Sequence, residues 1–83
     1  MTHLWREGLS IKVWTEEGKP RQLIWNETVH RTATILNQWR IDRGWWQLRV
    51  YRDYFKVETS TGFLLEVYHD LMTDRWYVQR WYD

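Results

Sequence analysis

The sequence predicts an all-β fold: about six antiparallel strands in a meander that closes into a small barrel or a strongly bent sheet. Apolar and polar residues alternate along several short segments with the two-residue period of a half-buried strand. All four glycines and the only proline fall between these segments, where turns use their backbone properties. A chain of 83 residues suits one small core. We therefore expect a single domain over residues 1–83, with a loosely ordered N-terminal segment at residues 1–8.

The first two strands are predicted at residues 9–15 and 21–26. Along the first strand, side chains alternate between two faces. One face carries Leu9, Ile11 and Val13, and the other carries Ser10, Lys12 and Trp14. Residues 16–20 contain a glycine and the proline, so they predict the hairpin loop that joins the two strands.

Residues 28–41 are ambiguous, because a stretch of this length without Gly or Pro fits a helix or a strand. Its many β-branched residues favour a strand, since they lose rotamer freedom in helices and pack well on a pleated surface. Most of its apolar residues also have odd numbers and would therefore point to one face of a strand, namely Val29, Ala33, Ile35, Trp39 and Ile41. The alternative is an α+β fold with a helix near 28–40 against a five-stranded sheet.

Three further strands are predicted at residues 48–59, 63–69 and 75–82, separated by turns. In the first of them the apolar parity changes between Val50 and Phe55. This change predicts a β-bulge or a strong bend near Arg52 and Asp53. The last strand is apolar on both sides, so at an exposed edge it could pair with a second copy and form a homodimer.

Composition excludes several classes of function. The chain has no cysteine, hence no disulfide or thiolate metal site, and it has no apolar run long enough for a membrane-spanning helix. Serine-elbow, phosphate-loop and metal-helix motifs are absent. His69 next to Asp70 could act as a base with its orienting group, although a structural role at a strand end is the simpler interpretation. We expect a cytoplasmic, non-enzymatic protein with no cofactor, no metal and no membrane partner.

Aromatic residues make up 18% of the chain and include eight Trp. The most informative segment is residues 38–56, where five basic and two acidic residues give a net charge of +3, whereas residues 57–83 have a net charge of −3. Two adjacent Trp cannot both enter the core from one strand, because consecutive side chains point to opposite faces. The segment therefore predicts a binding surface made of Trp45, Trp46, Arg40, Arg43, Arg49 and Arg52.

Two partner classes fit such a surface. Trp, Tyr and Arg are enriched at protein interfaces, and exposed aromatics among Arg residues also stack on the bases of single-stranded nucleic acid. A net charge of only +1 favours a protein partner, because nucleic-acid affinity grows with the number of phosphates neutralised. A third interpretation is that the Trp side chains simply fill the core, with Arg stems lying across them.

Several aromatic spacings resemble a known family. They are Leu23-Ile24-Trp25, the segment from Ile35 to Arg40, the Trp45-Trp46 pair, Tyr54-Phe55-Lys56-Val57, the segment from Leu65 to Asp70, and the closing Trp76-Tyr77-Val78. In these the chain resembles a bacterial family of small Trp-rich domains of unknown function. That family also occurs at the C-terminal end of the inactive Y-family polymerase-like subunit of the mutasome, a translesion synthesis assembly. The resemblance implies an accessory role in DNA repair through contacts, with a mutasome or polymerase-like component as partner.

Overall fold

The computed structural model describes residues 2–25, 27–44 and 49–82, and these form six antiparallel strands. The strands are β1 (Thr2–Glu16), β2 (Lys19–Trp25), β3 (Thr28–Arg43), β4 (Val50–Thr59), β5 (Leu64–Asp70) and β6 (Arg75–Tyr82). The all-β prediction is confirmed, and the ambiguous segment is a strand, as its β-branched residues favoured. Within the described residues there is no helix, and so none long and apolar enough to cross a membrane.

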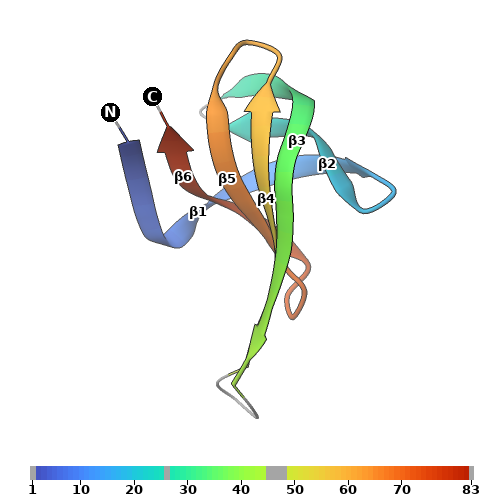
Figure 1. Ribbon diagram of the computed structural model, residues 1–83, viewed down its shortest axis with the longest axis vertical. Helices are drawn as coiled ribbons and strands as arrows, with labels where there is room; N and C mark the ends of the chain where they lie inside the picture. The colour runs from blue at the N-terminus through green and yellow to red at the C-terminus, as the bar shows by residue number, and fades with distance from the viewer. Residues whose placement is uncertain (1, 26, 45–48, 83) are drawn as a thin grey trace.

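Each strand pairs with its neighbours in the chain, and β6 returns to β1, which closes a barrel (Figure 1). Two long, bent strands belong to both of its sheets. β1 pairs with β6 along its first part and with β2 along residues 12–16, and β3 pairs first with β2 and then with β4. Because β6 is paired on both sides, it offers no free edge for the self-pairing that the sequence predicted.

The core lies between the two sheets and is built from inward-facing residues of β1, β2, β4, β5 and β6. Its buried members are Ile11, Leu23, Phe55, Val57, Leu65, Val67, Trp76 and Val78. Trp25 and Trp81 pack against this core and against each other, edge to face with their ring centroids 4.6 Å apart. Aromatic side chains therefore fill one end of the barrel.

β3 differs from the sequence prediction in which residues face inward. Its register against β4 shifts between Thr32 and Thr34 and again between Ile35 and Asn37. Each shift inserts one extra residue and reverses the parity of the inward face. Val29, expected to share a face with Ile35, is therefore 54% exposed.

Of the two alternatives predicted near Arg52 and Asp53, a β-bulge or a strong bend, the bulge is wrong. Both ladders of β4 continue through these two residues without a register shift on that strand. The apolar parity changes because β4 enters the barrel only after its first residues. Val50 lies on the part of β4 that precedes the barrel, so neither side of the strand faces the core at this residue. Phe55 lies further along β4, and its side chain is in the core.

Residues 2–8, predicted to be loosely ordered, belong to β1. Thr2, His3 and Leu4 pair with β6, and the ladder resumes at Leu9 after an irregularity that contains Gly8. At this bend the Glu7 carbonyl accepts a 2.9 Å hydrogen bond from the Tyr68 hydroxyl. Pairing with β6 and this bond hold the segment against the barrel.

Candidate functional site

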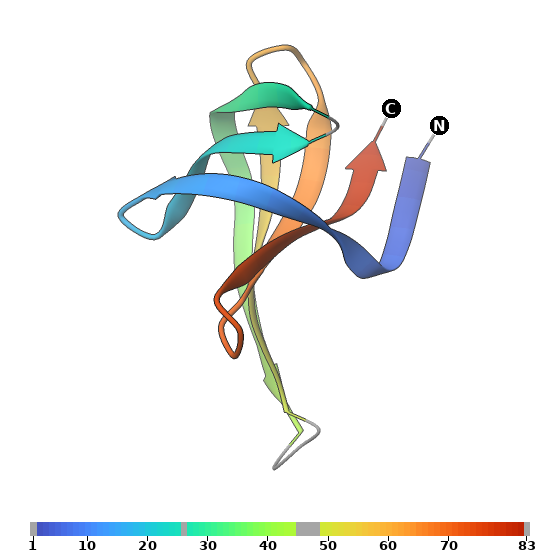
Figure 2. The same ribbon diagram turned by 180° about the vertical axis from the view of Figure 1, so that it is seen from behind.

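The β3–β4 hairpin projects beyond the rest of the barrel (Figures 1 and 2). We call its projecting part, residues 40–43 and 49–53, the arm. On one side of the arm, β2 pairs only with residues 28–31 of β3, and on the other side the ladder with β5 begins at Arg52. The arm therefore consists of two strands that mainly have each other as neighbours, and both its faces lie outside the core.

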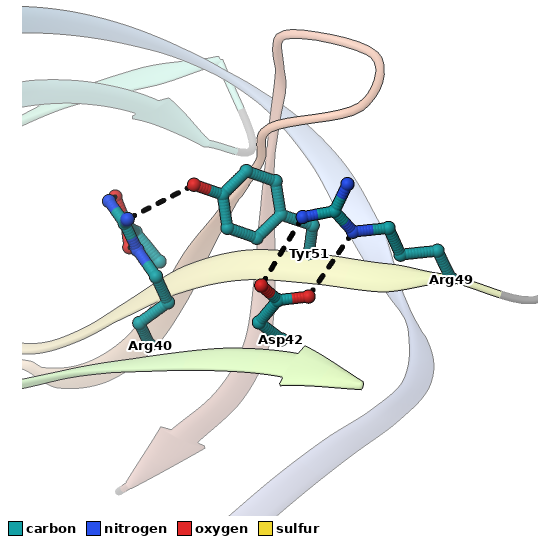
Figure 3. Close-up of polar contacts among 5 residues, drawn as sticks. Arg40, Asp42, Arg49 and Tyr51 are labelled. Carbon is teal, nitrogen blue, oxygen red and sulfur yellow. Dashed lines mark hydrogen bonds and ion pairs between the residues drawn. The ribbon is translucent and has the colours of Figure 1, made fainter. Parts of the chain in front are cut away.

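One face of the arm carries two guanidinium–carboxylate pairs around a tyrosine ring (Figure 3). Arg40 donates from Nε and Nη2 to the two carboxylate oxygens of Asp53, at 2.6 and 3.0 Å. Arg49 donates in the same two-pronged way to Asp42, with both distances 3.2 Å. The Cζ atoms of Arg40 and Arg49 lie 5.2 and 4.5 Å from the centroid of the Tyr51 ring. Arg40 also donates from Nη1 to the Tyr51 hydroxyl at 3.1 Å. These four charges sum to zero, and within the arm Arg40 has already used three donors and Arg49 two.

The hydrogen bond to Asp53 and its negative charge raise the pKa of Arg40 above the usual value, and Asp42 does the same to the pKa of Arg49. Arginine is already charged at any physiological pH. The consequence is geometric, because the bonds fix where each positive charge lies.

Arg52 lies on the opposite face of the arm, since neighbouring strand residues point to opposite sides. Its Nη1 donates to the Tyr54 hydroxyl at 3.2 Å, and its Cζ lies 4.4 Å from the centroid of the Tyr68 ring. Tyr54 in turn stacks on Trp39, with centroids 5.4 Å apart and planes 10° apart. This face is aromatic and is continuous with the outer surface of the barrel.

A hollow of about 310 Å³ opens at the base of the arm, where β5 ends and the turn to β6 begins. Two of the predicted site residues line it with five others: Arg49, Val50, Tyr51, Arg52, Asp70, Met72 and Thr73. Met72 is 55% exposed. The turn is fixed to the arm, because the Leu71 amide donates to the Tyr51 carbonyl at 2.9 Å.

The predicted site is thus distributed over two faces. Arg40 and Arg49 meet around Tyr51, Arg52 lies on the other face, and Arg49 and Arg52 share the hollow. Arg43 is exposed at the end of β3. Trp45 and Trp46 lie outside the described residues.

The charge division seen in the sequence is partly cancelled by the fold. The basic segment includes β4 and the acidic one includes β5, and these strands are neighbours. Lys56 lies opposite Glu66, and Arg52 lies opposite Asp70. The two segments therefore do not form two separate charged faces.

Sequence reasoning missed Trp14 as a surface residue. It is 50% exposed, whereas Trp76 is buried and Trp25 and Trp81 pack on the core. The signal was present in the alternation of the first strand, which put Trp14 on the face opposite Ile11. The predicted site does not include Trp14, because that site was selected from the charges and the Trp pair of residues 38–56.

His69 has a structural role in this fold. Its ring stacks on Trp76 with centroids 4.5 Å apart and planes 1° apart, and its Nε2 lies 2.7 Å from Oδ1 of Asp74. Asp70 instead accepts a bond from the Met72 amide within the turn. Among residues 2–25, 27–44 and 49–82, no group of three or more His, Cys, Asp or Glu side chains is placed to hold a metal ion.

Comparison of the chain with protein-family models, with curated proteins and with solved structures found no match.

Proposed function

We propose that this chain is a non-catalytic protein-interaction module, and that the arm is its contact surface together with Trp45 and Trp46. The observation that carries the proposal is the projection of a charge-paired, aromatic hairpin beyond the barrel. None of Arg40, Asp42 or Arg49 contributes to the core. A sequence that needed only to connect β3 to β4 would not require these side chains.

The ion pairing of Arg40 and Arg49 within the arm favours a protein partner over nucleic acid. Phosphate binding draws its free energy from neutralising charge and releasing counterions. Arg40 and Arg49 are already neutralised by Asp53 and Asp42. What this face offers instead is a tyrosine ring held between two guanidinium groups, and Tyr and Arg are the side chains that concentrate binding energy at protein interfaces.

The hollow at the base of the arm supports the same proposal. Exposed apolar atoms of Met72 lie there beside Tyr51 and two guanidinium stems. An apolar side chain of a partner that entered this hollow would lose contact with water, which is how interface anchors gain their affinity. The partner to test first is a mutasome or polymerase-like component of translesion synthesis, a choice that rests on the resemblance in sequence alone.

The proposal is tested by capturing partners from a native lysate with nuclease treatment as a paired condition, and then measuring the affinity of the purified partner. The arm variants are Trp45→Ala with Trp46→Ala, and Tyr51→Ala. We expect each to weaken binding about thirtyfold, since an interface anchor contributes about 2 kcal/mol or more. Leu36→Ala, which removes an exposed side chain of β3 outside the arm, is the matched control and should bind as the parent chain does.

Three results would contradict the proposal. Arm variants that bind as tightly as the parent chain would show that the arm is not the contact surface. Variants that unfold would show that the substituted rings are part of the core. Capture that disappears after nuclease treatment, together with oligonucleotide binding that is lost in Tyr51→Ala, would assign the arm to nucleic acid instead.

A further inference from the structure

The outer face of the sheet formed by β1, β2 and the start of β3 presents two rows of side chains. The register places Trp14 opposite Gln22 and Gln22 opposite Arg31. The second row consists of Lys12, Ile24 and Val29. The intervening residues Val13, Leu23 and His30 point into the barrel, so both rows point outward. In Figure 2, β1 and β2 lie at the front of the molecule.

This face combines an exposed indole with unpaired positive charge. Trp14 is 50% exposed. Lys12 and Arg31 are exposed and form no ion pair with any acidic residue in the described part of the chain. The arm, by contrast, holds both Arg40 and Arg49 in carboxylate pairs.

A hollow of about 430 Å³ lies beside the first row, where β3 leaves β2. Glu16, Arg21, Gln22, Arg31 and Thr32 line it. Arg21 is neutralised by Glu16 at 3.2 Å, which leaves Arg31 as the unpaired charge of the hollow.

We propose that this face binds single-stranded nucleic acid. An unpaired base stacks on the Trp14 indole, and phosphates of the same strand bind Lys12 and Arg31. Adjacent strands are about 4.8 Å apart, so the first row spans about 10 Å from Trp14 to Arg31. Gln22 lies between them, and its amide can both donate to and accept from a base edge.

Two features select this partner from the alternatives. A duplex hides its base faces within the stack, whereas a single strand exposes them to an indole. The carboxylate side chains of an acidic peptide would meet the two cations, but they have no flat ring to stack on Trp14.

The site uses β1, β2 and the first residues of β3, and none of the residues of the arm. It is therefore independent of the protein-interaction function proposed above.

The test measures the anisotropy of a labelled 12-residue oligo-dT strand with the full chain at several salt concentrations. Two phosphate contacts predict that log K falls with log salt with a slope of about −1.4, because each contact to a single strand contributes about −0.7. Trp14→Ala should weaken binding at least about fivefold, the lower end of what stacking one base contributes. Oligo-U should bind similarly, because the contacts use base faces and phosphates.

Control variants that remove an equal charge or a similarly exposed side chain elsewhere distinguish binding at this face from non-specific electrostatic attraction of the oligonucleotide to the protein. Arg31→Gln should reduce the magnitude of the salt slope by about 0.7, whereas Arg75→Gln, an exposed arginine of β6, should leave it unchanged. Leu36→Ala is the control for Trp14→Ala, because Leu36 is similarly exposed and lies outside both this face and the arm. Unfolding midpoints, measured in parallel, should match the parent's for all four variants.

The proposal is overturned if a duplex of the same length binds as well as the single strand. It is equally overturned if Trp14→Ala and Leu36→Ala bind alike, or if Arg31→Gln and Arg75→Gln change the slope equally. Displacement of the oligonucleotide by poly-glutamate at equal charge concentration would assign the face to an acidic peptide instead.

Discussion

Gly8 occupies a position that only glycine fits. Its φ of +81° lies in the left-handed region, which costs a residue with a Cβ about 1–2 kcal/mol. A Cβ there would also lie 2.8 Å from the Cβ of Tyr77 and 2.9 Å from the Tyr68 hydroxyl oxygen. The positive φ and the crowding by Tyr68 and Tyr77 thus each disfavour a residue with a Cβ at this position. The bend of β1 therefore requires glycine here.

We therefore expect Gly8→Ala to lower the free energy of unfolding by roughly 3 kcal/mol or more, the sum of left-handed strain and overpacking. Gly18→Ala is the matched control, because Gly18 has a φ of +78° with nothing within 4 Å of its added Cβ. The control should lose only about 1–2 kcal/mol. Urea denaturation measures both, and equal losses would show that Tyr68 and Tyr77 do not crowd the bend.

Tyr68 links the outer surface of the sheet to the same bend. Its ring is buried between Tyr54 and Tyr77, with centroids 5.1 and 5.0 Å away, and its hydroxyl donates to the Glu7 carbonyl. Burial raises the pKa of Tyr68, against the opposing effect of the Arg52 charge. The neutral phenol is therefore the form that the folded state prefers.

Tyr68→Phe should lower the free energy of unfolding by about 0.5–1.5 kcal/mol at neutral pH, since it removes one buried hydrogen bond. Because the folded pKa is raised, Tyr68 stabilises the fold fully below its unfolded pKa of about 10, and this contribution is lost as pH rises through the folded pKa. The stability difference between parent and variant should shrink above that pH in urea titrations. A difference that grew there would contradict the assigned sign.

At the scale of the strands, the sequence identified the elements better than their faces. Strand alternation and turn residues located all six strands, because both signals are local. The inward face of β3 could not be predicted from its parity, because two bulges reverse that parity and are defined only against β4. The pairing of Arg40 with Asp53, thirteen residues away, likewise depends on the register of two strands.

The same distinction applies to the candidate sites. Arg40, Arg43, Arg49 and Arg52 could be selected from their clustering in the sequence, but nothing local indicates that Arg40 and Arg49 are neutralised by carboxylates. Trp14 was the reverse case. Its parity was a local signal for exposure, but the predicted site was selected from residues 38–56 and did not include it.

At the scale of the whole molecule, closure makes the two sheets one cooperative unit. β1 and β3 each belong to both sheets, so neither sheet can open without disturbing strands of the other. Leu23 of β2 is fully buried in the same cluster as Val67 of β5. A chain of this length is expected to be stable by roughly 4–12 kcal/mol, so a single core residue matters to the entire fold.

Leu23→Ala should lower the free energy of unfolding by about 2–5 kcal/mol, because it leaves a cavity between the sheets. Trp fluorescence, which reports the aromatic end of the barrel, and far-UV circular dichroism should still show one coincident transition. Leu36→Ala, exposed on β3, should change stability by less than about 0.5 kcal/mol. If the two probes separated in Leu23→Ala, with part of the strand signal lost first, the β1–β2 hairpin would be an independent unit and the β1–β6 closure would not couple the sheets.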